Sequence, residues 1–189
     1  MSTLYLDGIH SITTIVFIVD IIALFLLLVG IVWSVVWPDR RIWPPPGRWS
    51  WQYVLTWICY CAVSGCNLAL LLLDWNSWIF AGDLRFLVGI PLALLLGLLA
   101  FWGVVTIGWK NSSGVRHGFI SFGPYRFTRN PQYLGDKVFF QRLSIVANSE
   151  LLWITHALLA LVFIIAPLSE EVWLKEEYER YRRNTPRFL

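Results

Sequence analysis

Residues 12–36 read ITTIVFIVDIIALFLLLVGIVWSVV, an apolar run of 25 residues that contains a single ionisable side chain, Asp20. About 20 apolar residues in a helix are enough to cross the hydrocarbon core of a bilayer. The run is longer than the apolar region of a signal peptide, and no Lys or Arg precedes it. It therefore predicts a membrane-spanning helix that is retained rather than cleaved.

Four further segments are predicted to be transmembrane helices, and they run from about 53 to 73, 86 to 108, 133 to 147 and 151 to 168. The chain is 57% hydrophobic and only 14% charged, whereas charged residues make up about 25% of an average soluble domain. Only Asn148, Ser149 and Glu150 separate the last two segments, so we expect these two to form a tight antiparallel hairpin. The sequence thus predicts a single all-α integral membrane domain, residues 1–189, with about five transmembrane helices.

The Lys and Arg residues predict how the chain is oriented in the membrane. Thirteen of the 15 lie around residues 40–48, 110–137 and 175–187, three regions that five membrane crossings place on one side. The positive-inside rule makes that side cytoplasmic, so we expect the N-terminus outside and the C-terminus inside. Acidic and basic residues alternate in the tail, which is expected to form a cytoplasmic amphipathic helix along the interface. A net charge of +3 is too small to indicate a nucleic-acid partner.

Residues 109–135 are the part of the chain richest in candidate binding groups. Four glycines in this stretch allow backbone to approach a ligand closely, and Arg116, Arg126 and Arg129 can bind anionic groups. The alternative is an ordinary basic loop that lies on anionic lipid headgroups. Spacing alone does not decide between these two interpretations.

A second candidate is the pair Glu170 and Glu171 at the end of the fifth apolar segment. Two carboxylates can accept hydrogen bonds from a cationic ligand, such as a sulfonium cofactor that carries an amino group; the alternative is a polar stop at the membrane boundary. Asp136 and Lys137, at the start of the fourth segment, are candidates for the rim of the same site. The three histidines are too dispersed in the sequence to predict a metal site.

Two ionisable residues, Asp20 and Arg142, fall inside predicted membrane spans. A charge at such a depth is costly unless it is paired or faces a polar cavity. We therefore expect these two side chains to approach each other or a polar cavity.

Residues 123–135, GPYRFTRNPQYLG, resemble the signature G-P-Y-R-x-x-R-H-P-x-Y-x-G of the isoprenylcysteine carboxyl methyltransferase and phospholipid methyltransferase superfamily. Residues 117–121, HGFIS, resemble the H-x-L-V-T run that precedes this signature, and the stretches 170–174 and 181–189 resemble the family's E-E-x-x-L and Y…V-P-R-F ending. The resemblance covers about residues 109–189, whereas the helices in residues 1–108 match only in being apolar. Asn130 stands where the family usually has His, so any role that needs imidazole protonation is absent. The tail is also about one helical turn shorter than is usual in the family.

The resemblance implies a membrane-embedded enzyme that transfers a methyl group from S-adenosylmethionine to a lipid or isoprenoid acceptor, on a carboxylate or an amine. In that family the signature loop and the Glu pair enclose the cofactor on the cytoplasmic side, and a membrane lipid or prenylated substrate enters between helices. The cofactor-binding residues that the resemblance implies are His117, Tyr125, Asn130, Pro131, Tyr133, Leu134, Glu170 and Glu171. Arg129 and Arg126 would orient an anionic acceptor, and Glu171 or Asp136 would take the proton of an amine acceptor.

Two other functions stay open at this point. Intramembrane sterol-type reductases, which use NADPH, have a similar C-terminal half, and a non-enzymatic membrane scaffold can keep the same fold. The Glu pair favours the methyltransferase, because the 2′-phosphate of NADPH prefers cations to carboxylates.

Overall fold

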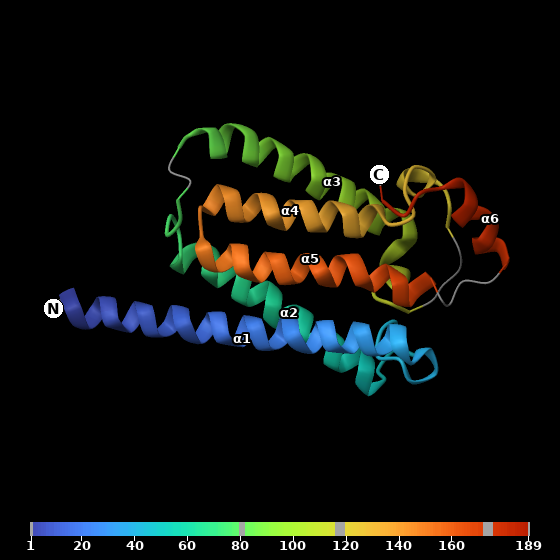
Figure 1. Ribbon diagram of the computed structural model, residues 1–189, viewed down its shortest axis with the longest axis horizontal. Coiled ribbons are helices and arrows are strands. Elements are labelled where there is room, and N and C mark those ends of the chain that lie inside the picture. Colours follow the sequence, from blue (N-terminus) through green and yellow to red (C-terminus); the bar gives the residue numbers. More distant parts are fainter. Residues whose placement is uncertain (1, 80–81, 116–119, 172–175, 189) are drawn as a thin grey trace.

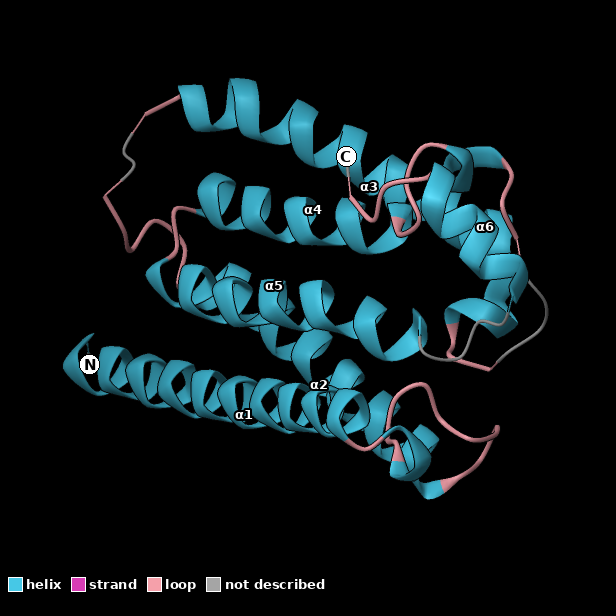
Figure 2. Ribbon diagram, turned by 45° about the vertical axis from the view of Figure 1, so that its right-hand side comes forward, coloured by secondary structure: helices cyan, strands magenta, loops and turns pink. Residues whose placement is uncertain are grey.

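The computed structural model describes residues 2–79, 82–115, 120–171 and 176–188 (Figure 1). Within these ranges the chain is built from helices and contains no β-strand (Figure 2). The helices are α1 (Ser2–Val36), the short 3-10 helix η1 (Pro38–Arg40), α2 (Trp51–Leu73), α3 (Leu84–Ser112), the 3-10 helix η2 (Gly123–Arg126), α4 (Pro131–Ala147), α5 (Glu150–Glu171) and α6 (Glu176–Asn184). The all-α prediction is confirmed, and each predicted apolar segment lies within one of the helices α1 to α5.

Among the described residues, α1, α2, α3 and α5 are long and apolar enough to cross a membrane. These helices make the chain a multi-pass integral membrane protein. The helix α4 has 17 residues and lies between α3 and α5 in both ribbon views (Figures 1 and 2). At 1.5 Å per residue it is about 26 Å long, slightly shorter than the hydrocarbon core of about 30 Å.

The turn between α4 and α5 is as short as the sequence predicted. Asn148 ends α4 in the left-handed conformation (φ 50°, ψ 46°), and α5 begins at Glu150. The side-chain amide of Asn148 donates hydrogen bonds to the side-chain oxygen of Asn76, at 2.9 Å, and to the carbonyl of Trp78, at 2.8 Å. These contacts fasten the hairpin to the loop between α2 and α3.

Glycines allow α3 and α4 to pack closely against each other. A Cβ atom on Gly135 of α4 would lie 2.6 Å from both the backbone nitrogen of Ala100 and the backbone oxygen of Leu96 in α3. A Cβ atom on Gly103 of α3 would lie 3.1 Å from the backbone nitrogen of Gln132. Small residues at such positions let membrane helices approach backbone to backbone. The contact fixes the start of α4 against the end of α3.

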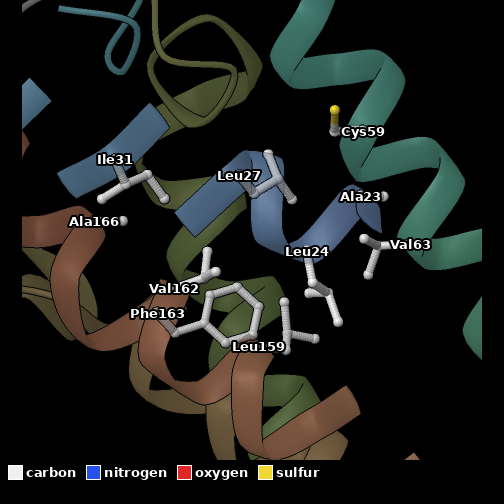
Figure 3. Close-up of a cluster of buried hydrophobic side chains, with 10 residues drawn as sticks. All are labelled: Ala23, Leu24, Leu27, Ile31, Cys59, Val63, Leu159, Val162, Phe163 and Ala166. Carbon is white, nitrogen blue, oxygen red and sulfur yellow. The ribbon is translucent and has the colours of Figure 1, made fainter. Parts of the chain in front are cut away.

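An apolar core lies between α1, α2 and α5 (Figure 3). In it, Leu24 of α1 packs with Val63 of α2 and Phe163 of α5. The outward faces of the helices are apolar as well, with exposed side chains such as Phe25 and Leu94. An apolar outer surface is expected where lipid, rather than water, is the solvent.

Asp20 is fully buried where α1, α2 and α5 meet. The side-chain amide of Asn67 donates a hydrogen bond to its carboxyl group at 3.1 Å, and the Asn67 side-chain oxygen accepts one from Thr155 at 3.4 Å. No ion pair among the described residues joins Asp20 to Arg142, so the prediction that these two pair is wrong. The physical reason is that α5 packs against both α1 and α4 and separates the two side chains. Buried polar side chains of α2 and α5 surround Asp20 instead.

The regions that carry most of the Lys and Arg residues gather at one end of the bundle (Figure 1). The connector between α1 and α2, the η2 turn and α6 lie at this end. The start of α1, the α2–α3 loop and the α4–α5 turn lie at the opposite end. The three cationic regions thus share one end, as the count of crossings predicted.

Candidate active site

At the cationic end, the described residues 120–130 form a turn that leads into α4. Gly123, the first residue of η2, has a positive φ of 62°, which a side chain would disfavour, and Pro124 follows it. Asn130 is non-helical (φ −134°, ψ 57°), in keeping with the restriction on a residue that precedes proline. Pro131 then takes the first position of α4, where its missing N–H costs no hydrogen bond.

The C-terminal residues lie across this turn. The hydroxyl of Thr128 donates a hydrogen bond to the carbonyl of Arg187 at 2.8 Å, and the backbone N–H of Arg129 donates one to the carbonyl of Pro186 at 2.9 Å. Tyr181 of α6 donates its hydroxyl to a carbonyl of η2. The short tail therefore still packs against the signature turn.

Glu171, at the end of α5, joins the turn and the tail through two ion pairs. A guanidinium nitrogen of Arg129 lies 3.0 Å from one carboxylate oxygen, and Arg187 binds the carboxylate through two nitrogens, at 3.0 and 2.6 Å. Arg129 also donates a hydrogen bond to the hydroxyl of Tyr178 at 3.0 Å. The side chains of Arg129 and Glu171 are only 9% and 11% exposed, so this is a largely buried network. It brings the signature turn, α5 and the tail together.

Glu170 is held by a different set of donors. The indole nitrogen of Trp43 donates a hydrogen bond to its carboxylate at 2.9 Å, and the hydroxyl of Tyr133 donates another to the same oxygen. Trp43 lies in the α1–α2 connector, just before the run of three prolines. A Cβ atom on Gly114, which has a φ of 82°, would lie 2.6 Å from the Trp43 ring. The connector is therefore held close to both the end of α3 and the Glu pair.

A cavity of about 300 Å³, which we call the loop cavity, lies among these groups. Residues of the α1–α2 connector, the end of α3, the signature turn, α4, α5 and α6 line it. The predicted site residues in its lining are Tyr125, Arg129, Asn130, Tyr133, Glu170 and Glu171.

The other predicted site residues lie elsewhere. Pro131 and Leu134 are not among the residues that line the loop cavity. Arg126 is exposed and its guanidinium lies over the ring of Phe127, 4.7 Å from the centroid. His117 lies outside the described residues.

Several residues that the sequence did not single out contribute to the site. Trp43 binds Glu170, Arg187 binds Glu171, and Tyr178 lines the cavity. The run Pro44-Pro45-Pro46 signalled a stiff connector, but it did not indicate which helix end the connector would contact. The sequence indicated Arg187 only as one of the tail cations and as part of the family's P-R-F ending.

The tyrosines around the loop cavity stay uncharged at neutral pH. Burial raises the pKa of Tyr181 to about 12, and burial with a neighbouring carboxylate raises the pKa of Tyr125. Burial and the interaction with Glu171 raise the pKa of Tyr178. The hydrogen bond to Glu171 raises the pKa of Arg187. The site therefore offers neutral hydroxyl donors beside fixed guanidinium and carboxylate groups.

A second cavity, of about 260 Å³, lies between the helices next to the loop cavity, and we call it the helix cavity. Ser112, Gln132 and Tyr133 line both cavities. Much of the wall is apolar and comes from core residues drawn in Figure 3, namely Leu27, Ile31, Val162, Phe163 and Ala166. The site thus consists of a more polar chamber at the bundle end and an apolar chamber among the helices.

Comparison with known families identifies the group to which this arrangement belongs. Residues 84–181, more than half of the chain, match the model of the family described as phospholipid methyltransferase. The chain belongs to the phospholipid methyltransferase family. The match runs from α3 through the signature turn, α4 and α5 to Tyr181 of α6, which are the elements that form most of the loop cavity. No curated protein and no solved structure matches the chain.

Membership of the phospholipid methyltransferase family confirms the superfamily resemblance, and the match covers residues 109–181 of the stretch that carries it. Together with the membrane-spanning helices, it indicates a membrane methyltransferase. The reductase and the non-enzymatic scaffold are not favoured by this match.

Proposed function

We propose that this protein transfers a methyl group from S-adenosylmethionine, held in the loop cavity, to a lipid or isoprenoid held in the helix cavity. The observation that carries the proposal is that both cavities are lined by Ser112, Gln132 and Tyr133. A donor in one chamber and an acceptor in the other would meet at these side chains. Methyl transfer requires an in-line approach of the acceptor, and positioning of this kind supplies much of the rate.

The loop cavity fits the proposed donor in size and chemistry. Its volume of about 300 Å³ is at the lower end of the range for small-molecule pockets. Glu170 offers a carboxylate to a cationic ligand. Arg129 offers its Nε, which is buried and has no hydrogen-bond partner among the described residues, to a carboxylate. The bound donor supplies a methyl group on a positively charged sulfur, and this chain supplies its position.

The contacts suggest a division of roles among the candidate residues. We assign Tyr125, Asn130, Tyr133 and Glu170 to contact with the donor, since all four line the loop cavity. Glu171 is assigned a positioning role, because two guanidinium groups already engage its carboxylate.

The remaining candidates are assigned indirect roles. Pro131 and Leu134, at the start of α4, would support the turn rather than touch the donor. Arg126 is exposed beside the exposed Phe127, which suits contact with lipid headgroups better than contact with the acceptor. His117 stays a prediction from the resemblance alone.

We further assign five membrane crossings, with the loop cavity on the cytoplasmic side. In support, α4 lies antiparallel between α3 and α5 (Figure 1), so the chain traverses the bundle five times. The cationic regions share the end that carries the loop cavity, and the positive-inside rule places such an end in the cytoplasm.

The experiment that tests the proposed function is a methyl-transfer assay on the protein purified in detergent. The protein is incubated with S-adenosylmethionine that carries a tritiated methyl group and with a total lipid extract. We expect tritium in the organic phase, and we expect its loss in Glu170→Ala. A folded protein that labels no lipid from any extract would overturn the proposal.

A further inference from the structure

Three of the described residues, Ser112, Gln132 and Tyr133, line both cavities, and each carries a neutral polar side chain. We call this place the junction. With the donor in one cavity and the acceptor in the other, the methyl group crosses at the junction. The side chains there meet the group that is transferred, rather than the distant parts of either ligand.

The hydroxyl hydrogens at the junction are committed to neighbouring residues. Ser112 donates its hydroxyl to the side-chain oxygen of Gln132 at 3.1 Å, and Tyr133 donates its hydroxyl to the carboxylate of Glu170. A hydroxyl group has one hydrogen to donate and two lone pairs that accept. The oxygens of Ser112 and Tyr133 therefore present only lone pairs to a ligand.

The backbone of α3 is interrupted just before Ser112. Gly108 has φ 75° and ψ 158°, a conformation that is essentially confined to glycine. A Cβ atom on Gly108 would meet nothing within 4 Å, so the backbone conformation, and not a lack of space, requires glycine here. The last turn of α3, residues 109–112, leaves the direction of the helix at this kink, and Trp109 and Ser112 both reach the wall of the helix cavity. The interruption thus brings Ser112 to the junction.

We infer that the junction binds the sulfonium methyl group itself, through C–H···O hydrogen bonds to the oxygens of Ser112 and Tyr133. This inference rests on the proposed function and deepens it, because it names groups that touch the transferred carbon. The positive sulfur withdraws electrons from the methyl group and makes its C–H bonds better hydrogen-bond donors. An oxygen that can only accept is the matching partner. Ser112 is thus a catalytic residue, and Gln132, which fixes the Ser112 hydroxyl, is a positioning residue.

These contacts act during the transfer without moving a proton. The electron pair of the acceptor forms a bond to the methyl carbon on the side opposite sulfur, and the carbon–sulfur bond breaks. Its electron pair stays on sulfur, which becomes a neutral thioether, while the acceptor gains the methyl group and one unit of positive charge. Midway, the three C–H bonds lie in a plane across the line of transfer and point at the surrounding wall. Oxygens in that wall hold the carbon on the line between the two cavities.

The test compares two ligands that differ only in this methyl group and its charge. S-adenosylmethionine and S-adenosylhomocysteine are titrated separately into the purified protein without added lipid. Ser112→Ala removes the oxygen and is expected to weaken the binding of S-adenosylmethionine about two- to fivefold, the equivalent of one weak hydrogen bond. Its affinity for S-adenosylhomocysteine should not change, which shows that the variant is folded. Ser112→Thr, which keeps the hydroxyl, and Ser64→Ala, an exposed control on α2, should bind both ligands as the wild type does.

Nuclear magnetic resonance observes the contact itself. The donor is S-adenosylmethionine with a carbon-13 label in its methyl group. A C–H···O hydrogen bond moves the proton resonance of a methyl group downfield, so the resonance of the bound donor should lie further downfield in the wild type than in Ser112→Ala.

The outcomes separate this inference from the proposed function. An unchanged ratio of the two affinities or an unchanged resonance in Ser112→Ala overturns the inference, and so does an equal loss for both ligands, which a structural role of Ser112 would give. Tritium transfer to lipid by the wild type would still support the proposed function in each of these cases. A wild type that binds neither ligand overturns both.

Discussion

Replacing Glu171 with Gln should release the C-terminal tail from the signature turn. The side chain of Glu171 is 11% exposed and pairs with Arg129, which is 9% exposed, and with Arg187, which is 34% exposed. Removal of one partner from a buried ion pair costs about 3–5 kcal/mol. The Gln oxygen still accepts a hydrogen bond and Arg187 is partly solvated, so we expect about 3 kcal/mol, the low end of that range.

Amide hydrogen exchange at the signature turn measures this loss of free energy. The backbone N–H of Arg129 is bonded to the carbonyl of Pro186, so its exchange reports whether the tail is docked. A loss of about 3 kcal/mol corresponds to exchange that is roughly 100-fold faster. Mass spectrometry of a peptide that contains residues 123–135 gives the rate, and opening of the tail alone leaves the helices of the bundle protected.

An ion pair on the surface of α6 provides a matched control. Arg182 and Glu179 are 3.4 Å apart, but both are more than half exposed. Exposed pairs contribute about 0–1 kcal/mol, so Glu179→Gln should leave the exchange of the Arg129 peptide nearly unchanged. Equal exchange rates in wild type, Glu171→Gln and Glu179→Gln would refute the reasoning, because they would show that Glu171 does not hold the tail.

Three further substitutions test other parts of the structure. Gly135→Ala places a methyl group against the α3 backbone and should lower the free energy of unfolding by about 1–3 kcal/mol, measured by thermal unfolding in detergent. Gly65→Ala is the control, because a Cβ atom there meets nothing within 4 Å, and it should not lower the melting temperature. Equal melting temperatures of the two variants would contradict the close contact between α3 and α4. Trp43→Phe removes one hydrogen bond from Glu170 and should weaken the binding of S-adenosylhomocysteine about tenfold, by calorimetric titration; an unchanged affinity would show that this bond does not shape the site. Asp20→Asn should change the melting temperature little, because a carboxyl group buried in a membrane bundle is stable when uncharged and an amide mimics that form; a large drop would show that the charged form is required.

The helices were predictable because membrane spans are encoded locally. Each needs a run of apolar residues about as long as the bilayer is thick, and such runs can be counted in the sequence. The α4–α5 turn was equally local, since only three residues separate the two runs. The partner of Asp20 was not local. It depends on which helix faces α1, and Asn67 and Thr155 come from two different helices.

In the candidate site, too, some features were predictable from the sequence and others were not. The signature turn and the Glu pair were expected to meet, and the 3.0 Å contact between Arg129 and Glu171 brings them together. The sequence could not show that Trp43 reaches Glu170, because the two are 127 residues apart. Nor could it show the helix cavity, which exists only where side chains of several helices fail to fill the space between them.

The measurement that tests the central claim most directly is calorimetric titration of the purified protein with S-adenosylhomocysteine and, separately, with NADPH. We predict saturable one-to-one binding of S-adenosylhomocysteine and none of NADPH. The double variant Glu170→Ala, Glu171→Ala should remain in the membrane but lose this binding. A wild type that binds NADPH or neither compound, or a double variant with undiminished affinity for S-adenosylhomocysteine, would contradict the assignment of the loop cavity as the donor site.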